Sequence, residues 1–370
     1  MSTPRLEVRL DRIAHNTASL VGRLAGKGIS VTAVTKSMLG EPRVAQVVLG
    51  AGAVGLADSR LRNVVAMRDG GVRAPMTMIR TPLLSEVDGV VRDCETSCNT
   101  EPAVLTALSS AAVRQDRVHQ VMLMVELGDL REGIMPAQLA DIAQLVVGLP
   151  NLTLHGIGAN LACRHGVVPD DANMAELSVM VAVVEQATGC QLAVVSGGNS
   201  ANLGWALGPA HVGRINDLRL GEALVLGRDP LDRRPIDGLF TDAVTLVGEV
   251  IESGPKPSTP WGRFAQNSFG RRVDEGESLP ASPEETPPAV MQTIVALGRQ
   301  DTDPEDLVAP AGVTIMSASS DHLVTRTEHQ VAIGTEVRFR PGYSALLRSM
   351  STPTVITSYS DARDVHRQPH

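Results

Sequence analysis

The sequence predicts an α/β protein: a (β/α)8 TIM barrel followed by a mostly β C-terminal domain. Three observations lead to this fold class. Short apolar runs of strand length alternate with amphipathic runs of helix length through the first two-thirds of the 370 residues. The short runs are apolar on both faces, as the strands of a parallel sheet covered by helices are. Eight such pairs in about 220 residues match the size of a TIM barrel.

The predicted strands and helices follow one another at a regular spacing. The strands cover residues 29–36, 53–59, 75–81, 95–100, 119–127, 152–160, 191–198 and 216–227. The helices cover residues 11–28, 41–52, 60–71, 83–93, 101–115, 136–149, 173–189 and 200–208. In the first helix Asp11 is the expected N-cap, and Pro42 occupies the first turn of the second helix, where its missing N–H is tolerated.

A doubly wound open sheet is the rival architecture for alternating strands and helices. Such sheets usually have fewer strands and carry a glycine-rich turn after the first one. No glycine-rich turn follows residues 29–36, so the barrel is the better prediction.

The pattern changes after Gly227. Residues 229–238 are polar and contain proline, as domain boundaries often do. Runs with the character of strands, and no convincing long helix, follow over residues 242–253, 289–298, 312–319, 322–327 and 336–350. The acidic, proline-rich residues 271–288 predict a mobile loop. We therefore expect a barrel over residues 8–228 and a β domain over residues 229–370, with residues 1–7 as a candidate addition to the latter.

Composition excludes several classes of function. A formal net charge of −8 argues against nucleic-acid and anionic-membrane partners, which require a basic face. No apolar run reaches the roughly 18 residues of a membrane span, and the first residues do not resemble a signal peptide. The four cysteines form no CxxC pair, and Cys94 and Cys98 lack further ligands, so we expect buried free thiols and no metal site. These features predict a cytoplasmic protein.

Lys36 stands at the C-terminal end of the first predicted strand, where TIM barrels place their chemistry. Most lysines are solvated surface charges, and that is the alternative interpretation. At the mouth of a barrel, a desolvated amine can lose its proton and attack a carbonyl carbon to form an imine. The position favours the functional interpretation.

The last two strands of the barrel end in small residues. Gly197 and Gly198 let backbone N–H groups approach a ligand, Ser200 opens a short helix, and Gly221 lies at the end of the neighbouring strand. TIM barrels commonly bind phosphate in the loops after strands seven and eight. A pair of glycines alone is more often only a turn, but the two loops together favour a phosphate site. A reactive lysine opposite a phosphate site indicates pyridoxal 5′-phosphate.

With these motifs in place, the sequence resembles the alanine racemase-like (fold type III) pyridoxal phosphate enzymes, and most closely their ornithine racemase branch. The stretches that carry the resemblance occur in order over nearly the whole chain: VTAVTK, GLADSR, LMVELGDLREGI, GIGANLAC, VSGGNS, LRLGEALVLGRD, LGRQD, SASSDHL and YSALLRSM. Each stretch is weak alone, and the combination is specific.

The resemblance implies roles for particular residues. Lys36 would bind the cofactor covalently and act as one of two racemisation bases. Arg219 falls where alanine racemases place an arginine against the pyridine nitrogen, which keeps that nitrogen unprotonated; a structural salt bridge is the alternative. Asn160 takes the place of a histidine that stacks on the ring. Phosphate contacts are expected from Asn199, Ser200, Gly221, Tyr343 and, through its backbone N–H, Glu222. Ser196 and Gly198 are further residues expected to bind the cofactor.

Two positions concern the substrate carboxylate. Arg131 matches a family arginine that lies near it, although an exposed arginine in a loop would look the same. Met124 departs from the family pattern, because alanine racemases can have here a lysine that orients the arginine once carbamylated. A methionine cannot do this.

The second base is the largest departure from the family. Alanine racemases use a tyrosine of the partner subunit, and the corresponding residues 261–270 offer only Phe264 and Phe269, which cannot transfer a proton. Decarboxylases of the same scaffold have a Cys-Asp pair where this chain has Ser320 and Asp321. Imidazole titrates in the working range, so His322 is the candidate base, with Ser320 beside it and Cys163 in reserve. Asp321 would bind a side-chain ammonium, and an ordinary turn is the alternative for this segment.

Together these residues predict an amino-acid racemase for ornithine or another basic amino acid. We expect a homodimer whose active sites are completed across the interface. One rival is a decarboxylase or aldolase on the same scaffold, and Arg219 speaks against the decarboxylase. The other is a non-catalytic pyridoxal phosphate carrier, a class that lacks the second domain.

Overall fold

The structure, a computed structural model, describes residues 3–209, 211–262, 265–266, 282 and 289–361. The chain divides into two compact units. One is Arg9–Ala243, and the other joins the residues up to Val8 to Val244–Ser360. Residues 229–243 thus group with the first unit. The predicted loop at 271–288, apart from Ser282, and the residues Phe264 and Phe269 lie outside the described part.

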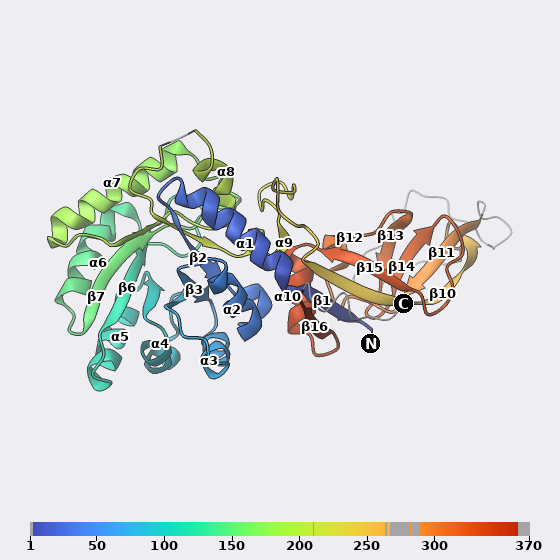
Figure 1. The fold of residues 1–370 in the computed structure, drawn as a ribbon, viewed down its shortest axis with the longest axis horizontal. Helices are drawn as coiled ribbons and strands as arrows, with labels where there is room; N and C mark the ends of the chain where they lie inside the picture. The colour runs from blue at the N-terminus through green and yellow to red at the C-terminus, as the bar shows by residue number, and fades with distance from the viewer. Residues whose placement is uncertain (1–2, 210, 263–264, 267–281, 283–288, 362–370) are drawn as a thin grey trace. The chain divides into compact units, whose positions relative to one another are not determined.

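The first unit is a closed parallel barrel surrounded by helices, which confirms the predicted fold class (Figure 1). Its strands, in barrel order, are β2 (Ser30–Val34), β3 (Gly55–Asp58), β4 (Met76–Met78), β5 (Thr96–Asn99), β6 (His119–Met124), β7 (Leu152–Gly158), β8 (Val194–Ser196) and β9 (Asp217–Leu220). Pairing of β2 with β9 closes the ring, with Thr32 opposite Arg219. The C-terminal ends of β2, β8 and β9 are therefore neighbours.

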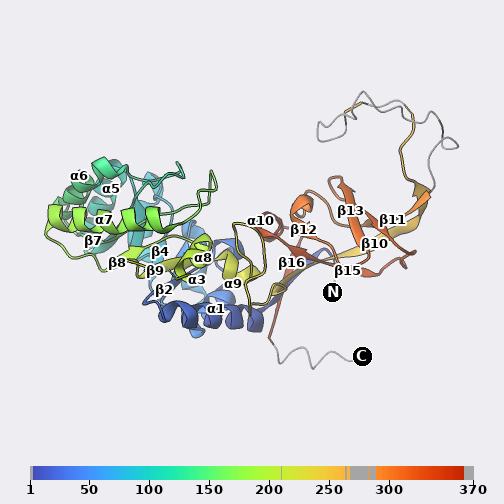
Figure 2. The same cartoon turned by 90° about the horizontal axis from the view of Figure 1, so that it is seen from above.

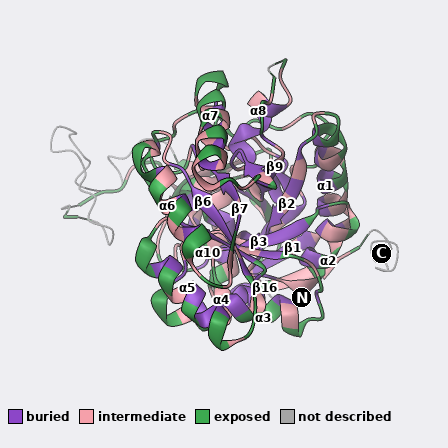
Figure 3. Cartoon of the chain, turned by 90° about the vertical axis from the view of Figure 1, so that its left-hand side faces the viewer, coloured by how far each residue is buried: buried purple, intermediate pink, exposed green. Residues whose placement is uncertain are grey.

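Helices cover the outside of the barrel with their apolar faces inward, and their outer faces are exposed (Figure 3). They are α1 (Leu10–Ala25), α2 (Pro42–Gly50), α3 (Leu61–Asp69), α4 (Val87–Asp93), α5 (Pro102–Arg114), α6 (Pro136–Gly148), α7 (Asp171–Thr188), α8 (Leu203–Ala206) and α9 (Glu222–Leu226). Short 3-10 turns precede three of them: η1 (Lys36–Met38), η2 (Leu84–Glu86) and η3 (Ser200–Asn202).

Two local predictions in the barrel were wrong. The N-cap of α1 is Arg9 and not Asp11, because the Arg9 N–H is held by the Ala243 carbonyl (2.8 Å) in extended conformation and the helix begins directly after it. The expected last strand also stops early: β9 ends at Leu220 and α9 follows. All residues of Ala223–Leu226 are buried, and so short an apolar run has no periodicity that separates strand from helix.

The second unit is mostly β, as expected. Its sheet has the order β12-β15-β10-β11-β14-β13, and β1 pairs with β10 and with β16. Strands β10, β11, β13 and β15 of this sheet are labelled in Figure 2. The strands are β1 (Arg5–Arg9), β10 (Val244–Pro257), β11 (Ala289–Val295), β12 (Leu307–Val308), β13 (Val313–Ala318), β14 (Leu323–Thr327), β15 (Glu336–Pro341) and β16 (Ile356–Ser360).

A helix in this unit corrects the expectation of strand character through residue 350. The helix is α10 (Tyr343–Ser351), and the carboxylate of Asp306 caps it by accepting the N–H groups of Ser344 (2.7 Å) and Ala345 (3.2 Å). This cap comes from 38 positions away along the chain, so the local sequence does not show it.

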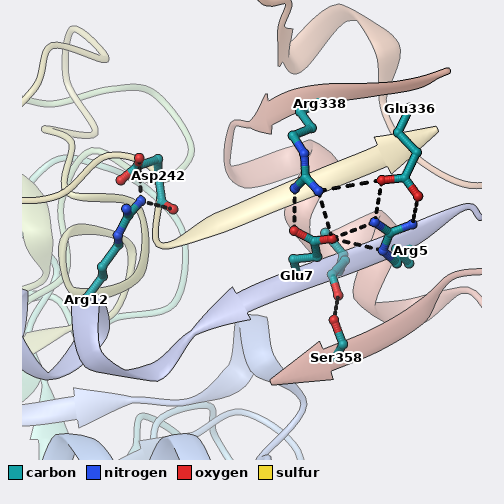
Figure 4. A network of polar contacts seen from close by, with 8 residues as sticks. Arg5, Glu7, Arg12, Asp242, Glu336, Arg338 and Ser358 are labelled. Carbon is teal, nitrogen blue, oxygen red and sulfur yellow. Dashed lines mark hydrogen bonds and ion pairs between the residues drawn. The ribbon is translucent and has the colours of Figure 1, made fainter. Parts of the chain in front are cut away.

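Arg5 ties β1 to the rest of this unit through an ionic network in which Arg5 itself is buried (Figure 4). Its guanidinium bonds Glu7 (2.7 Å) and Glu336 (2.6 Å), and Arg338 pairs with the same two carboxylates. Only 4% of Arg5 is exposed.

Within the described residues, no helix is long and apolar enough to cross a membrane.

Candidate active site

Lys36 opens the η1 turn directly after β2. The backbone before it is held in place because the Thr35 N–H donates to the Ala57 carbonyl (2.9 Å) on the neighbouring strand β3. Burial lowers the pKa of the Lys36 amine, and the charge of Arg131 lowers it further against the opposing influence of Cys163 and Asp58. A larger share of the unprotonated amine at neutral pH favours attack on a carbonyl.

Asp58, the last residue of β3, holds the backbone next to Lys36 by bonding the side chain of Thr35. Its fully buried carboxylate accepts hydrogen bonds from Thr35 Oγ1 (2.8 Å), Asn63 Nδ2 (3.0 Å) and the Arg60 N–H (3.0 Å). Burial raises the pKa of Asp58 despite these donors. The bond to Thr35 fixes the residue that precedes the reactive lysine.

The loops after β8 and β9 are joined by side chains of the predicted phosphate site. Ser200 Oγ accepts the backbone N–H groups of Gly221 (3.3 Å) and Ala223 (3.2 Å). Gly198, in the loop between β8 and Ser200, has φ +146°, a backbone conformation that favours glycine. The side chain of Glu222 pairs with Arg233.

Asn160 and Asn199 link these loops to the end of β7. Asn199 Nδ2 donates to Asn160 Oδ1 (3.2 Å) and to the Leu161 carbonyl (2.8 Å). Asn160 Nδ2 is buried and has no acceptor among the described residues. A buried amide donor without an acceptor is costly unless a ligand or water receives it.

Arg219 is the end of a chain of hydrogen bonds that we call the buried relay: the buried Arg219, Ser196 and Asp217, and the half-buried Thr32. Arg219 Nη1 donates to Ser196 Oγ, Ser196 Oγ donates to Asp217 Oδ2, and Thr32 Oγ1 donates to Asp217 Oδ1 (2.7 Å). Arg219 Nη2 reaches the Ala159 carbonyl (2.6 Å) beyond β7. A cation is thus held in place between β7 and β9.

Arg131 lies in the loop after β6 and contacts Cys163 in the loop after β7. Its Nη1 is 3.3 Å from Cys163 Sγ, and the thiol is exposed. Asp129 holds the second loop by accepting N–H groups of Cys163 (3.0 Å) and Arg164 (2.8 Å), among others. Burial alone raises the pKa of Asp129, but these backbone donors outweigh it and hold the pKa below its ordinary value.

Met124 packs in the core and makes no polar contact with Arg131 that could replace a carbamylated lysine. It forms a buried cluster with Cys98 and Met122.

Cys94 and Cys98 are buried free thiols. Burial raises the pKa of the Cys98 thiol to about 11 and that of the Cys94 thiol to about 12, so both thiols are inert. Among the described residues, no group of His, Cys, Asp and Glu could hold a metal ion.

The remaining predicted site residues belong to the second unit. Ser320, Asp321 and His322 form the exposed turn between β13 and β14, where Asp321 Oδ1 accepts from Ser320 Oγ (3.0 Å) and lies 3.0 Å from His322 Nδ1. The donor Ser320, followed by His322, lowers the pKa of Asp321. Tyr343, half-buried, is the first residue of α10. This turn has the contacts of a local structural motif as well as the groups for proton transfer.

With this geometry in view, comparison with known proteins decides the family. The model for the N-terminal domain of alanine racemase matches residues 8–229, more than half of the chain. The chain belongs to the alanine racemase family.

Two curated relatives extend over nearly the whole of this family member. A lysine racemase from Thermotoga maritima is 34% identical, with 97% of this chain and 99% of the relative covered. An ornithine racemase from Acetoanaerobium sticklandii is 32% identical, with 94% and 97% covered. The similarity in sequence therefore spans both units of this chain.

A solved structure of alanine racemase from Streptomyces lavendulae has the same fold. It matches with a TM-score of 0.74 at 18% identity, and all of both chains is covered. At this low identity the likeness concerns the fold alone.

Sequence reasoning missed three buried or loop-fixing carboxylates of this alanine racemase family member: Asp58, Asp129 and Asp217. For Asp217 a signal was present, because Asp217 and Arg219 are two positions apart on one strand and so share a face. For Asp58 the signal was its position at the end of a predicted strand, next to the lysine-bearing one. Asp129 binds backbone groups some 35 positions away, which no local pattern reveals.

Proposed function

We propose that this chain is a pyridoxal-phosphate-dependent racemase of basic amino acids, with lysine and ornithine as the substrates to test first. The observation that carries the proposal is the match of nearly the full chain to two curated racemases of basic amino acids. A homodimer in the cytoplasm, with active sites completed by the partner subunit, is part of the same proposal.

The residues at the C-terminal end of the barrel fit the cofactor. Lys36 offers an amine whose pKa burial lowers, and Asn160 Nδ2 is a buried donor that lacks an acceptor among the described residues. Arg219 offers a fixed cation. When bound, pyridoxal phosphate supplies the electron-accepting ring that makes the Cα proton of an amino acid acidic.

Each residue then has a defined task. Lys36 holds the cofactor and moves the Cα proton on one face of the substrate. Arg219 would hold the pyridine nitrogen, and Asn199, Ser200, Gly221, Glu222 and Tyr343 would hold the phosphate. Gly198 would let backbone N–H groups approach the cofactor, and Ser196 would act on it through Arg219, to which it is hydrogen-bonded. Arg131 binds the substrate carboxylate, and Asp321 binds the side-chain ammonium.

A chiral assay with mass analysis of the product tests the proposal. Purified protein with pyridoxal phosphate should convert L-ornithine or L-lysine to an equal mixture of enantiomers without a change of mass. Loss of carbon dioxide would instead indicate a decarboxylase, retro-aldol cleavage of a β-hydroxy amino acid an aldolase, and the absence of any reaction a carrier.

The second proton-transfer group can be tested with three variants, His322→Ala, Ser320→Ala and Cys163→Ser, in deuterated water. If His322 is the second base, its variant should still exchange the Cα proton of one enantiomer through Lys36 while racemisation falls about a hundredfold. Ser320→Ala should racemise normally, since a serine hydroxyl is a poor acid near neutral pH. Cys163→Ser should also racemise normally, because the thiol then takes no part in the proton transfer. Normal racemisation by the His322 variant, with loss in the Cys163 variant, would assign the role to the thiol beside Arg131.

Substrate preference provides a separate test for Asp321. Asp321→Ala should lose racemisation of ornithine about a hundredfold more than that of alanine, because only the longer substrate carries a second ammonium group. Measured kcat/KM values for both substrates check this. Equal losses on both substrates would make the segment an ordinary turn.

A further inference from the structure

The buried relay contains a carboxylate that the family roles above leave without a task. Asp217 is 4% exposed, as is Arg219, and Ser196 between them is fully buried. The three side chains come from the adjacent strands β8 and β9, and Thr32 comes from β2 on the other side of β9. The hydrogen bonds of the relay are all made between residues of the barrel strands.

Hydrogen-bond chemistry fixes the direction of the relay. A guanidinium only donates, so Ser196 Oγ must accept from Arg219 Nη1. The single hydroxyl proton of Ser196 is then directed to Asp217 Oδ2, while the other carboxylate oxygen, Oδ1, accepts the proton of Thr32. The relay therefore runs from cation to anion through one serine.

The surroundings leave the guanidinium little freedom. A Cβ added to Gly158 would lie 3.1 Å from Arg219 Nη1 and 3.0 Å from the Ser196 carbonyl, so the glycine makes room for the cation. With Nη1 on Ser196 and Nη2 on the Ala159 carbonyl, Nε is the remaining nitrogen of this group.

Charge balance gives Asp217 its function. A buried guanidinium is unfavourable without a compensating anion, and charges interact strongly where water is excluded. How strongly Arg219 attracts electrons from a hydrogen-bonded partner depends on how far its charge is compensated. A carboxylate at the other end of a single hydroxyl supplies that compensation.

We propose that Asp217 is a positioning residue that acts through Ser196 to orient Arg219 and to set the electron demand that Arg219 places on the ring nitrogen of the cofactor. This inference rests on the proposed function, because it needs pyridoxal phosphate to lie against Arg219.

The test uses the holoenzyme loaded with cofactor that carries ¹⁵N in the pyridine ring. Asp217→Asn keeps the shape and still accepts the Ser196 proton but removes the charge. Ser196→Ala keeps both charges and breaks the connection. Ser97→Ala is the matched control: this fully buried barrel serine also links two polar side chains, bonding His119 Nε2 (2.8 Å) and Asn99 Nδ2 (2.9 Å), with no contact to the relay.

We expect the ¹⁵N signal of the ring to shift in Asp217→Asn and in Ser196→Ala, with kcat about tenfold lower and KM within about twofold. Ser97→Ala should lower the melting temperature without moving the ¹⁵N signal. If Asp217→Asn does not fold, Thr32→Val tests the same point, because it weakens the hold on Asp217 and should give a smaller shift in the same direction.

Two results would overturn the inference. One is a ¹⁵N signal in the folded Asp217 and Ser196 variants that is the same as in wild type. The other is an equal shift in the Ser97 control, which would reduce the relay to a contribution to barrel stability. A wild-type protein that binds no cofactor at Lys36 would instead contradict the proposed function, so the two failures are distinguishable.

Discussion

Lys36→Ala should lower racemisation by about 10⁴-fold or more and abolish covalent binding of pyridoxal phosphate. Lys36 is the lysine at the C-terminal end of the barrel strands, and burial lowers the pKa of its amine, which are the two conditions for imine formation. Reduction with borohydride followed by peptide mass analysis measures the covalent bond directly. In wild type the mass of the reduced cofactor should appear on the peptide that contains Lys36.

Lys27 provides the control for this experiment. Lys27 follows α1, and its amine donates to the Gly208 carbonyl (2.8 Å). Lys27→Ala therefore removes a lysine of the same unit that already has a structural partner. That variant should keep both the label and the activity. Finding the label on Lys27 or Lys256, or an unlabelled but fully active Lys36 variant, would show that the assignment of Lys36 is wrong.

Arg5→Met should destabilise the second unit by about 2–3 kcal/mol, since it removes the cation shared by Glu7 and Glu336. The estimate is at the lower end for a broken buried pair, because both carboxylates keep some contact with water. Hydrogen exchange of the β10 amides, measured on the full chain, reports this loss without assuming that the two units unfold together. The control is Arg338→Met, which removes the other cation of the network from a side chain that is 51% exposed. It should cost less than about 1 kcal/mol.

The same network predicts a pH dependence. The hydrogen bond that Arg5 donates lowers the pKa of Glu336. Burial alone raises the pKa of Glu7, but the hydrogen bonds from Arg338 and Arg5 bring that pKa below its ordinary value. Carboxylates with lowered pKa stabilise the folded state above their unfolded pKa, near 4.3, and this contribution disappears as the pH falls through the folded values. The difference in stability between wild type and Arg5→Met should therefore be full at pH 7 and shrink below about pH 4. A difference that does not change with pH would mean that packing of the arginine, not its charge, is responsible.

The sequence predicted what depends on periodic burial and on position along a strand. The alternation of apolar runs was enough for the barrel, and the ends of its strands were enough to single out Lys36 and Ser200 as candidates, whereas Arg219 was singled out by the resemblance to the alanine racemases. What it could not predict depends on partners distant along the chain. The helix α10 begins at Tyr343 because of the carboxylate of Asp306, and no neighbouring residue announces it. Whether Arg219 is a structural salt bridge or a ligand-facing cation was also undecidable from the sequence, because its partners are Ser196 on β8 and Ala159 after β7, both distant along the chain.

The pairing of β1 with β10 has a consequence for how the polypeptide is made. Arg5 leaves the ribosome well before its partner Glu336, which is 331 positions further along the chain. The strands β2 to β9 can close into a ring while translation continues, because every one of them is synthesised before β10. During that interval β1 has an unpaired edge and an arginine without its distant carboxylate. Completion of the second unit must wait for β10 and β15, so β1, although synthesised before the whole barrel, is among the last strands to pair.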